Sequence, residues 1–543
     1  MFKSLISNVF DARKFVVLGC LLLSLLFIFS NSFAAEVELS SATITELNAA
    51  FDAGTLNSEK LVQLYLHRID AYNNNGPAIN AVLMLNPNAL SQARALDIER
   101  LNKGPRSPMH GIPVVIKDNL DTADMPTTAG SFLLKNSYPP DDAFLVKKLR
   151  DAGAIILAKL NMSEFASGDA LSSLGGAIGN PHSSTRSPDG SSGGTGASIA
   201  AAFASIGLGT DTGGSVRYPS SANGIVGLKT THGLLSRDGV VPLALSFDTV
   251  GPMARSVTDV AIALGVMTGV DKADASTQKS FDKFETNYTQ FLQADSLKGS
   301  RIGVARVFMG GDAEVDWVVE SSLQSMRDAG AEVIDVEFPA WLLESRGKFY
   351  RAIRYPEFKA QIAEYLATLD AEYPKTLTEL ISAAMLLTAK NDQGAMPNAT
   401  RWSLMMKEDK SSELTDYEYL AVRDHALPLI GATIGGLIRA EKLDAIVYPT
   451  QPTPAQLIEA PSVGSISAGS GESPVILANL SGFPDLIVPA GFTSRGLPVT
   501  LSFMGPAFSE PKLIGLGYAL EQRLKAIRLP ALTPSLENET IRY

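Results

Sequence analysis

Cysteine and histidine are scarce in this sequence. Cys20 is the single cysteine among 543 residues, so the chain cannot form an internal disulfide or a thiolate metal site. The five histidines include no His-x-x-x-His pair, so no ligand set for zinc is visible, and we expect these histidines to be structural. We therefore expect neither a metal nor another cofactor.

Positive charge is also in deficit. The net charge is −11 and no dense run of Lys or Arg occurs, which argues against nucleic acid or an anionic membrane as a partner. The mixture of 45% hydrophobic and 19% charged residues is ordinary for a globular protein. A chain of this length can bury a large core, so its stability does not require disulfides.

The first 34 residues have the features of a secretory signal peptide. Three basic residues precede an apolar run at 15–29, and Ser32 and Ala34 are small residues placed as a signal peptidase prefers them. The apolar run has 15 residues, which is short for a membrane span of ~20 residues. We expect cleavage after Ala34, no membrane span afterwards, and a periplasmic or secreted protein.

Two other interpretations of this segment stay open. It could remain as an uncleaved N-terminal anchor, or it could be a lipoprotein signal, because residues 17–20 loosely resemble a lipobox ending in Cys20. Most of the apolar run follows Cys20, which disfavours the lipoprotein. Cleavage after Ala34 would remove three basic residues and one acidic residue, leaving a net charge of −13 and no cysteine.

Short apolar runs alternate with helical patterns along most of the chain. Residues 43–70 are predicted to form two helices, the first begun by a capping box of Thr43 and Glu46. Continuous β-branched runs separated by helices indicate an α/β fold, with a mixed sheet covered on both faces. These predicted strands lie at 112–116, 155–158, 302–305, 333–336, 445–448, 486–488 and 499–503.

The middle of the chain has the weakest strand signal. We expect residues 35–543 to form a single domain in which 271–430 is the variable part. Residues 271–298 are polar and charged, which is typical of a surface connection. Residues 340–430 show helical patterns, which indicates a helical insertion at a substrate entrance.

Two Gly/Ser clusters, at 187–196 and 207–215, flank an Ala-rich stretch at 197–204. A flexible linker would explain the first cluster alone, but the Ala-rich stretch is suited to a buried helix and not to a tether. Glycines let backbone N–H groups converge on an anion, and in acyl transfer that anion is the oxyanion of the tetrahedral intermediate. The phosphate-binding Gly-x-x-x-x-Gly-Lys-Ser/Thr pattern is absent.

Residues 190–194 also match Gly-x-Ser-x-Gly, which would make Ser192 the nucleophile of an α/β-hydrolase. That motif requires an apolar strand immediately before it, whereas residues 182–189 are polar and contain Pro188. It also requires a late histidine, and His425 lies in a helical context. We therefore disfavour a Ser-His-Asp triad.

Lys117 is the best candidate for a base that works without histidine. It follows the apolar run 112–116, so we expect it at the mouth of a buried strand. Burial lowers the pKa of a lysine by up to ~3–5 units, because the charged form loses solvation. A surface lysine that ends a strand is the commoner case, and the two Ser/Gly clusters are what favour the catalytic interpretation.

The segment 188–231 resembles the amidase signature family. The family pattern is a Gly/Ser-rich stretch, an Ala-rich helix, Gly-Thr/Ser-Asp-x-Gly-Gly-Ser-Ile/Val-Arg and then Gly-x-x-Gly-x-Lys. Here 209–217 is Gly-Thr-Asp-Thr-Gly-Gly-Ser-Val-Arg and 224–229 is Gly-Ile-Val-Gly-Leu-Lys. Looser matches extend the resemblance over most of 40–530, and they lie at 111–119, 127–131, 159–164, 448–452 and 479–484.

The resemblance implies a mixed, mostly parallel sheet flanked by helices, and it implies a role for each matching residue. Ser215 would be the nucleophile that forms an acyl-enzyme. Ser191, in a cis peptide linkage, would relay the proton to Lys117, the neutral base. The implied oxyanion hole is formed by the N–H groups of Thr212, Gly213, Gly214 and Ser215. The residues implied to hold the loops are Ser192, Asp211 and Arg217.

Two positions depart from the family pattern. Asp189 stands where glycine is usual, two residues before Ser191, and Thr230 stands where proline is usual. Neither change removes a catalytic group, although Asp189 adds charge near the relay.

Three functions stay open at this point. The resemblance favours a self-sufficient amidohydrolase that cleaves carboxamide bonds in small-molecule or peptide amides. A second possibility is a component like the A subunit of the tRNA-dependent amidotransferase, which the signal peptide and the negative charge disfavour. A third is a non-catalytic binding protein on the same scaffold, which the presence of Lys117, Ser191 and Ser215 together disfavours.

Overall fold

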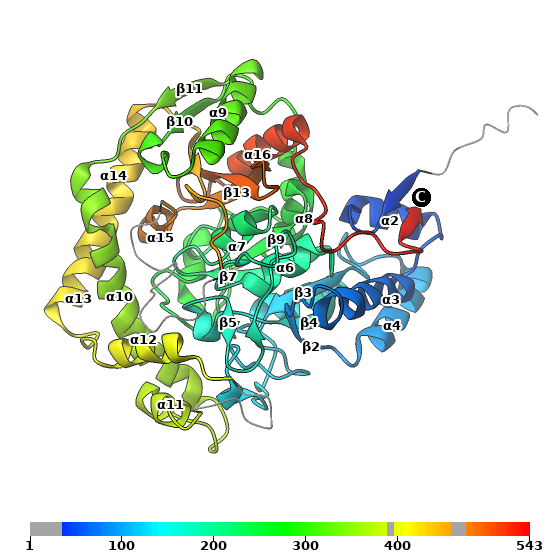
Figure 1. Cartoon of the computed structure of the whole chain (residues 1–543), viewed down its shortest axis with the longest axis horizontal. Coiled ribbons are helices and arrows are strands. Elements are labelled where there is room, and N and C mark those ends of the chain that lie inside the picture. The colour runs from blue at the N-terminus through cyan, green and yellow to red at the C-terminus, as the bar shows by residue number, and fades with distance from the viewer. Residues whose placement is uncertain (1–34, 388–395, 459–473) are drawn as a thin grey trace, which may run out of the picture.

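The computed structural model describes residues 35–387, 396–458 and 474–543 (Figure 1). The predicted signal peptide at 1–34 lies outside these residues. An eleven-stranded sheet has the order β11-β10-β12-β14-β13-β8-β9-β7-β3-β4-β2. In chain order its strands are β2 (Val82–Leu85), β3 (Pro113–Lys117), β4 (Ile155–Leu160), β7 (Ile206–Asp211), β8 (Val226–Lys229), β9 (Thr249–Ala254), β10 (Arg301–Val304), β11 (Glu332–Asp335), β12 (Ala445–Pro449), β13 (Asp485–Phe492) and β14 (Pro498–Met504).

The direction of the strands changes across this sheet. Strands β11, β10 and β12 are parallel, and so are β4, β3 and β7. The pairs between these two groups, from β12 to β7, are antiparallel, as is the edge pair β2 and β4. The predicted mixed sheet is therefore confirmed, with its parallel pairs confined to two wings. All seven predicted runs form strands of this sheet.

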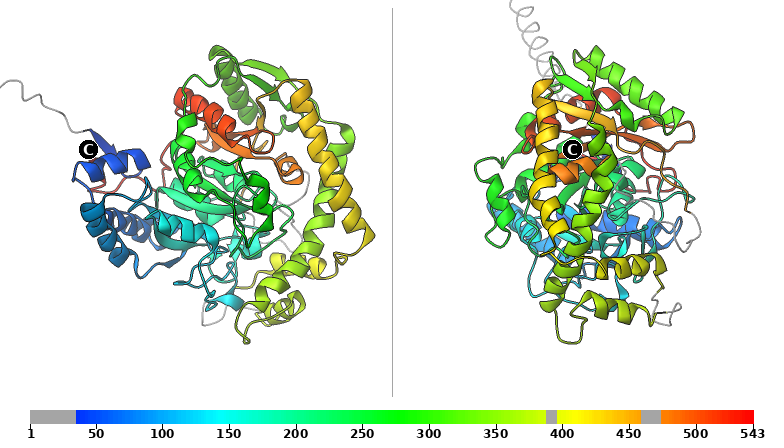
Figure 2. Two further views of the ribbon diagram at one scale, coloured as in Figure 1. Left: turned by 180° about the vertical axis from the view of Figure 1, so that it is seen from behind. Right: turned by 90° about the vertical axis from the view of Figure 1, so that its left-hand side faces the viewer.

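Helices flank the sheet, as predicted (Figures 1 and 2). Thr43 and Glu46 form the predicted capping box at the start of α2. The α-helices are α2 (Ile44–Asp52), α3 (Ser58–Ile69), α4 (Ala89–Lys103), α5 (Phe144–Asp151), α6 (Gly193–Ala200), α7 (Arg217–Ala222), α8 (Val257–Met267), α9 (Ala313–Asp328), α10 (Ala340–Ala367), α11 (Leu377–Ala384), α12 (Ala399–Asp409), α13 (Tyr417–Ala421), α14 (Leu427–Ala440), α15 (Ile476–Ser481) and α16 (Glu510–Leu524).

Shorter elements complete the chain. Two small antiparallel sheets pair β1 (Glu36–Glu38) with β15 (Thr540–Arg542) and β5 (Leu171–Ser172) with β6 (Gly176–Ala177). The short 3₁₀ and π helices are η1 (Asp70–Asn74), η2 (Phe132–Leu134), η3 (Glu164–Ala166), η4 (Ala275–Ser280), η5 (Tyr288–Phe291), η6 (Arg306–Phe308) and η7 (Val422–Ala426). Over the three described ranges, no helix has the length and apolar character needed to cross a membrane.

Helices α10 to α14 stand along one side of the molecule (Figures 1 and 2). This confirms the helical region predicted at 340–430, apart from 388–395, which lie outside the described residues. The variable region predicted at 271–430 also contains β10 and β11, which are two of the predicted strands and belong to the central sheet. In the described part of 340–430 the chain therefore contributes helices and no strand to the central sheet.

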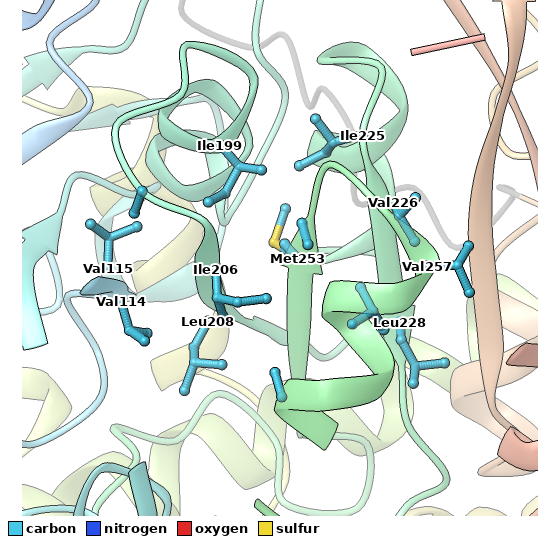
Figure 3. Packing of buried hydrophobic residues seen from close by; sticks show 14 of the residues in the cluster. Val114, Val115, Ile199, Ile206, Leu208, Ile225, Val226, Leu228, Met253 and Val257 are labelled. Carbon is cyan, nitrogen blue, oxygen red and sulfur yellow. The ribbon is translucent and has the colours of Figure 1, made fainter. Parts of the chain in front are cut away.

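The core fixes the register of the two strands that carry the site. Val114 on β3 pairs with Ile206 on β7, and Ile116 pairs with Leu208. Figure 3 shows Val114, Ile206 and Leu208 packed with Met253 of β9, and all four side chains are fully buried. Burial of such a side chain contributes about 1.5–3 kcal/mol. Since β3 and β7 are parallel neighbours, their carboxyl ends lie at the same edge of the sheet, where ligands commonly bind.

Candidate active site

Lys117 is the last residue of β3 and is fully buried. Its Nζ lies 2.7 Å from Ser191 Oγ, 2.7 Å from Thr210 Oγ1 and 3.5 Å from the Thr210 carbonyl oxygen. Burial lowers the pKa of Lys117 from 10.5 to about 7, and the charges of Asp211 and Asp248 oppose this shift in part. The lysine can therefore exchange a proton near neutral pH, as a general base must.

Ser191 lies in the loop that precedes α6. Its peptide bond with Gly190 is cis, and its carbonyl oxygen accepts a hydrogen bond from the Ser163 N–H at 3.0 Å. A Cβ at Gly190 would lie 2.3 Å from Ser163 Oγ, so a larger residue here would require the Ser163 side chain to move. Ser191 is 2% exposed, and it lies next to Lys117 as expected for a proton relay.

Ser215 lies in the loop between β7 and α7 and is partly exposed. Its carbonyl oxygen accepts a hydrogen bond from the Ser192 N–H at 3.2 Å, which joins this loop to the one that carries Ser191. Within the described residues no hydrogen bond joins the Ser215 hydroxyl to Ser191. The structure thus brings the two serine loops into contact and leaves the Ser215 side chain accessible.

The four N–H groups implied as an oxyanion hole are not equivalent. The Gly214 N–H donates to Asp211 Oδ1 at 2.8 Å, so this donor is already engaged within the loop. Gly214 has a φ of 116°, a conformation that favours glycine. The remaining candidates are the N–H groups of Thr212, Gly213 and Ser215, which belong to the same turn.

Asp211 and Arg217 form a buried ion pair behind this turn, with Arg217 Nη2 2.9 Å from Asp211 Oδ1. Burial alone would raise the pKa of Asp211, but the charge and hydrogen bonds of Arg217 outweigh it and hold the pKa well below its usual range. The other Asp211 oxygen accepts from the Val216 N–H at 3.0 Å. Arg217 also pairs with Asp485 of β13 at 2.9 Å. These contacts tie the turn to the start of α7 and to the sheet.

Ser192 is fully buried beside β7. Its Oγ donates to the Thr210 carbonyl oxygen at 3.2 Å and accepts from the Thr210 N–H at 3.3 Å. Both hydrogen-bonding directions of this hydroxyl are thus used by the backbone of the strand. This arrangement suits a residue that holds a loop and not a nucleophile.

Comparisons with known proteins identify the family of this chain. Residues 60–514 match the Amidase family. The chain belongs to the amidase signature family. The A subunit of glutamyl-tRNA(Gln) amidotransferase of Thermoanaerobacter pseudethanolicus is 36% identical over 90% of this chain and 98% of its own length. A probable amidase of Arabidopsis thaliana is 34% identical over 92% of this chain and 95% of its own length.

Solved structures are similar over nearly the whole chain. Peptide amidase from Stenotrophomonas maltophilia has a TM-score of 0.81 and 38% identity, covering 91% of this chain and 99% of its own. The A subunit of glutamyl-tRNA(Gln) amidotransferase from Thermotoga maritima has a TM-score of 0.70 and 27% identity, covering 92% and 99%. This protein is thus an amidase-signature enzyme that acts on carbon–nitrogen bonds.

The two departures from the amidase pattern lie in different surroundings. Asp189 adopts a left-handed φ of 60°, and its Oδ2 accepts from Gln451 Nε2 at 2.6 Å. Burial raises the pKa of Asp189 to about 6, a shift that the Gln451 bond opposes. Thr230 is buried and donates to the Val250 carbonyl oxygen at 3.1 Å. Asp189 is therefore a buried carboxylate close to the site, while Thr230 bonds to the backbone of the neighbouring strand β9.

The structure adds residues that the amidase motif alone does not single out. A Cβ at Gly213 would lie 2.5 Å from the hydroxyl of Tyr350, so this tyrosine of α10 abuts the turn that holds Ser215. Its ring stacks on Phe247 with centroids 5.4 Å apart. Tyr350 is 137 positions from Gly213 in the chain, and nothing in its local sequence indicates the contact. Within the described residues, no group of three or more His, Cys, Asp or Glu side chains could hold a metal ion.

Proposed function

We propose that this protein is an amidohydrolase that cleaves carboxamide bonds through an acyl-enzyme on Ser215. The observation that carries the proposal is the buried Lys117, whose Nζ lies 2.7 Å from Ser191 Oγ and whose pKa is lowered to about 7. A neutral lysine in hydrogen-bonding contact with a serine is a base that can act without histidine.

The reaction follows from this order of groups. Ser191 takes the proton of Ser215 as it passes its own to Lys117, while Ser215 Oγ attacks the carbonyl carbon of the amide. The C–N bond then breaks, and the amine leaves with the proton returned through Ser191. Water repeats the sequence on the ester, so that the carboxylic acid leaves and the Ser215 hydroxyl is restored.

The oxyanion of each tetrahedral intermediate would be bound by the turn that carries Ser215. The N–H groups of Thr212, Gly213 and Ser215 are the donors proposed for this role, because Gly214 donates to Asp211. Such fixed donors are worth about 2.7–4 kcal/mol of transition-state stabilisation each. The ion pair of Asp211 with Arg217 supports the turn from behind.

Small-molecule or peptide amides are the proposed substrates. The similarity to peptide amidase over 91% of the chain supports this class. The decisive assay is hydrolysis of a panel of peptide amides, fatty amides, aryl amides and esters by the purified chain alone. Ser215→Ala should abolish turnover of every substrate while the protein keeps its fold. Normal turnover by the folded variant would refute the nucleophile assignment.

A second candidate function is that of a component of an amidotransferase, which the 36% identity with the A subunit of glutamyl-tRNA(Gln) amidotransferase favours. Such a component would depend on partner chains. Turnover of small amides by the isolated chain supports the self-sufficient hydrolase. Activity that appears only with a co-purifying partner, together with release of ammonia from glutamine, supports the amidotransferase.

We place the enzyme outside the cytoplasm, on the basis of the signal-like segment at 1–34. Fusion of residues 1–40 to a reporter that is active only after export tests this location. Reporter activity in the periplasm or the medium supports it, and retention in the cytoplasm contradicts it.

A further inference from the structure

Thr210, the fifth residue of β7, lies between the catalytic lysine and a buried amide. Its hydroxyl oxygen is 2.7 Å from Lys117 Nζ and 3.1 Å from Asn119 Nδ2. Lys117 ends β3 and Asn119 follows it by two positions, and both side chains bond to this hydroxyl oxygen. All three side chains are buried, so water cannot replace any of these contacts at low cost.

A neutral primary amine has two N–H groups and one lone pair. Lys117 Nζ has three oxygen neighbours, which are Ser191 Oγ, Thr210 Oγ1 and the Thr210 carbonyl oxygen. A carbonyl oxygen only accepts, so it takes one N–H. If Thr210 Oγ1 takes the other, the lone pair of the amine points to Ser191, which is the direction that proton transfer requires.

We infer that Thr210 and Asn119 are positioning residues that aim the lone pair of Lys117 at Ser191. Asn119 donates to Thr210 Oγ1, which holds this hydroxyl oxygen in place and leaves it a lone pair for an N–H of Lys117. When Lys117 takes up the proton of Ser191, the same oxygen remains bonded to the ammonium. The inference rests on the proposed role of Lys117 as the base.

The arrangement also opposes the effect of burial on the base. An acceptor beside a buried ammonium favours the charged form, and thereby raises the pKa of the lysine relative to burial alone. Ser192 holds the backbone of Thr210 at both its N–H and its carbonyl, so the strand keeps both oxygens beside Lys117. Without the Thr210 hydroxyl, Lys117 would be a weaker base and less well oriented.

The test uses the rate at which a fluorophosphonate labels Ser215, which requires no knowledge of the substrate. Labelling breaks the P–F bond, forms a Ser215 O–P bond and passes the serine proton to the relay. We would measure the rate from pH 5 to pH 10 for the full chain and for four variants. These are Thr210→Val, Thr210→Ser, Asn119→Leu and Thr230→Val.

Thr210→Val should move the midpoint of the pH profile down by about one unit, the size of one charge-assisted hydrogen bond, and lower the plateau about tenfold. Thr210→Ser should restore both. Thr230→Val is the matched control, because it removes another buried hydroxyl, one bonded to a backbone carbonyl, and it should leave the midpoint unchanged. If Thr210→Val does not fold, Asn119→Leu should give a smaller shift in the same direction.

The outcomes separate this inference from the proposed function. An unchanged midpoint in both Thr210→Val and Asn119→Leu, or an equal shift in Thr230→Val, would overturn the positioning role. Lys117→Met is then compared at pH 8. Labelling of this variant at the rate of the unaltered chain would instead show that Lys117 is not the base, and both proposals would fail. If Lys117→Met loses labelling but the midpoint of the pH profile of Thr210→Val is unshifted, only the positioning role is refuted.

Discussion

Replacement of Lys117 by methionine should change how the stability of the protein depends on pH. Burial lowers the pKa of Lys117 from 10.5 to about 7 in the folded chain, which corresponds to about 5 kcal/mol at 1.36 kcal/mol per unit. Between these pH values the unfolded chain binds the proton and the folded chain does not. The lysine therefore disfavours folding most at pH 7 and below, and this cost disappears as the pH rises to 10.5.

The assay is urea unfolding of both proteins at intervals from pH 7 to pH 10. The free energy of unfolding of the unaltered chain, minus that of Lys117→Met, should rise by about 3.5 kcal/mol from pH 7 to pH 10, because the unfolded lysine is still mostly protonated at pH 10. Lys229, whose pKa burial also lowers to about 7, is present in both proteins and cancels. Lys60→Met, at an exposed position, is the control and should give a flat difference. A flat difference for Lys117→Met would show that this lysine stays protonated in the folded protein.

Three further substitutions test the surroundings of the site. Asp189→Asn removes a carboxyl whose pKa is raised from 3.8 to about 6. In urea unfolding, this substitution should stabilise the chain by up to about 3 kcal/mol above pH 6 and should have no such effect at pH 3. Arg217→Met leaves Asp211 and Asp485 buried without their cation and should cost about 3–5 kcal/mol, in the same assay at pH 7. Arg401→Leu removes a buried hydrogen bond to the Glu164 carbonyl oxygen. Limited proteolysis should therefore cut α11 and α12 faster than in the unaltered chain, while fluorophosphonate labelling persists. Equal cleavage rates in the two proteins would refute this expectation.

The strands that could be predicted from the sequence are those with continuous apolar runs. Strand β7 is not among them, because Gly207 and Gly209 interrupt the pattern of β-branched residues. Contact with α6 and its N-cap requires these glycines, since a Cβ at Gly207 would lie 2.5 Å from a Thr195 methyl and one at Gly209 would lie 2.8 Å from Ser192 Oγ. The glycines that belong to the family motif therefore also remove the apolar pattern by which β7 could have been predicted as a strand.

The residues of the site also fall into those that could be predicted from the sequence and those that could not. Lys117, Ser191 and Ser215 could be proposed because each lies in a motif whose residues are close in sequence. Tyr350 could not be proposed, because its contact with the turn depends on how a separate helix packs against the core. The bond from Asn119 to Thr210 joins residues 91 positions apart and depends on the register of β3 and β7. Sequence patterns thus predict chemistry within a motif, and tertiary packing decides what surrounds it.

The pairing of β1 with β15 has a consequence for handling the protein. Glu36 pairs with Arg542 and Glu38 with Thr540, so the two ends of the described chain form a separate clasp, outside the eleven-stranded sheet. The clasp is anchored to the rest of the protein, because Ile541 is buried in the main core and Glu539, just before β15, forms a buried ion pair with Arg68 of α3. Ending the chain before Thr540 would therefore leave β1 without its partner strand.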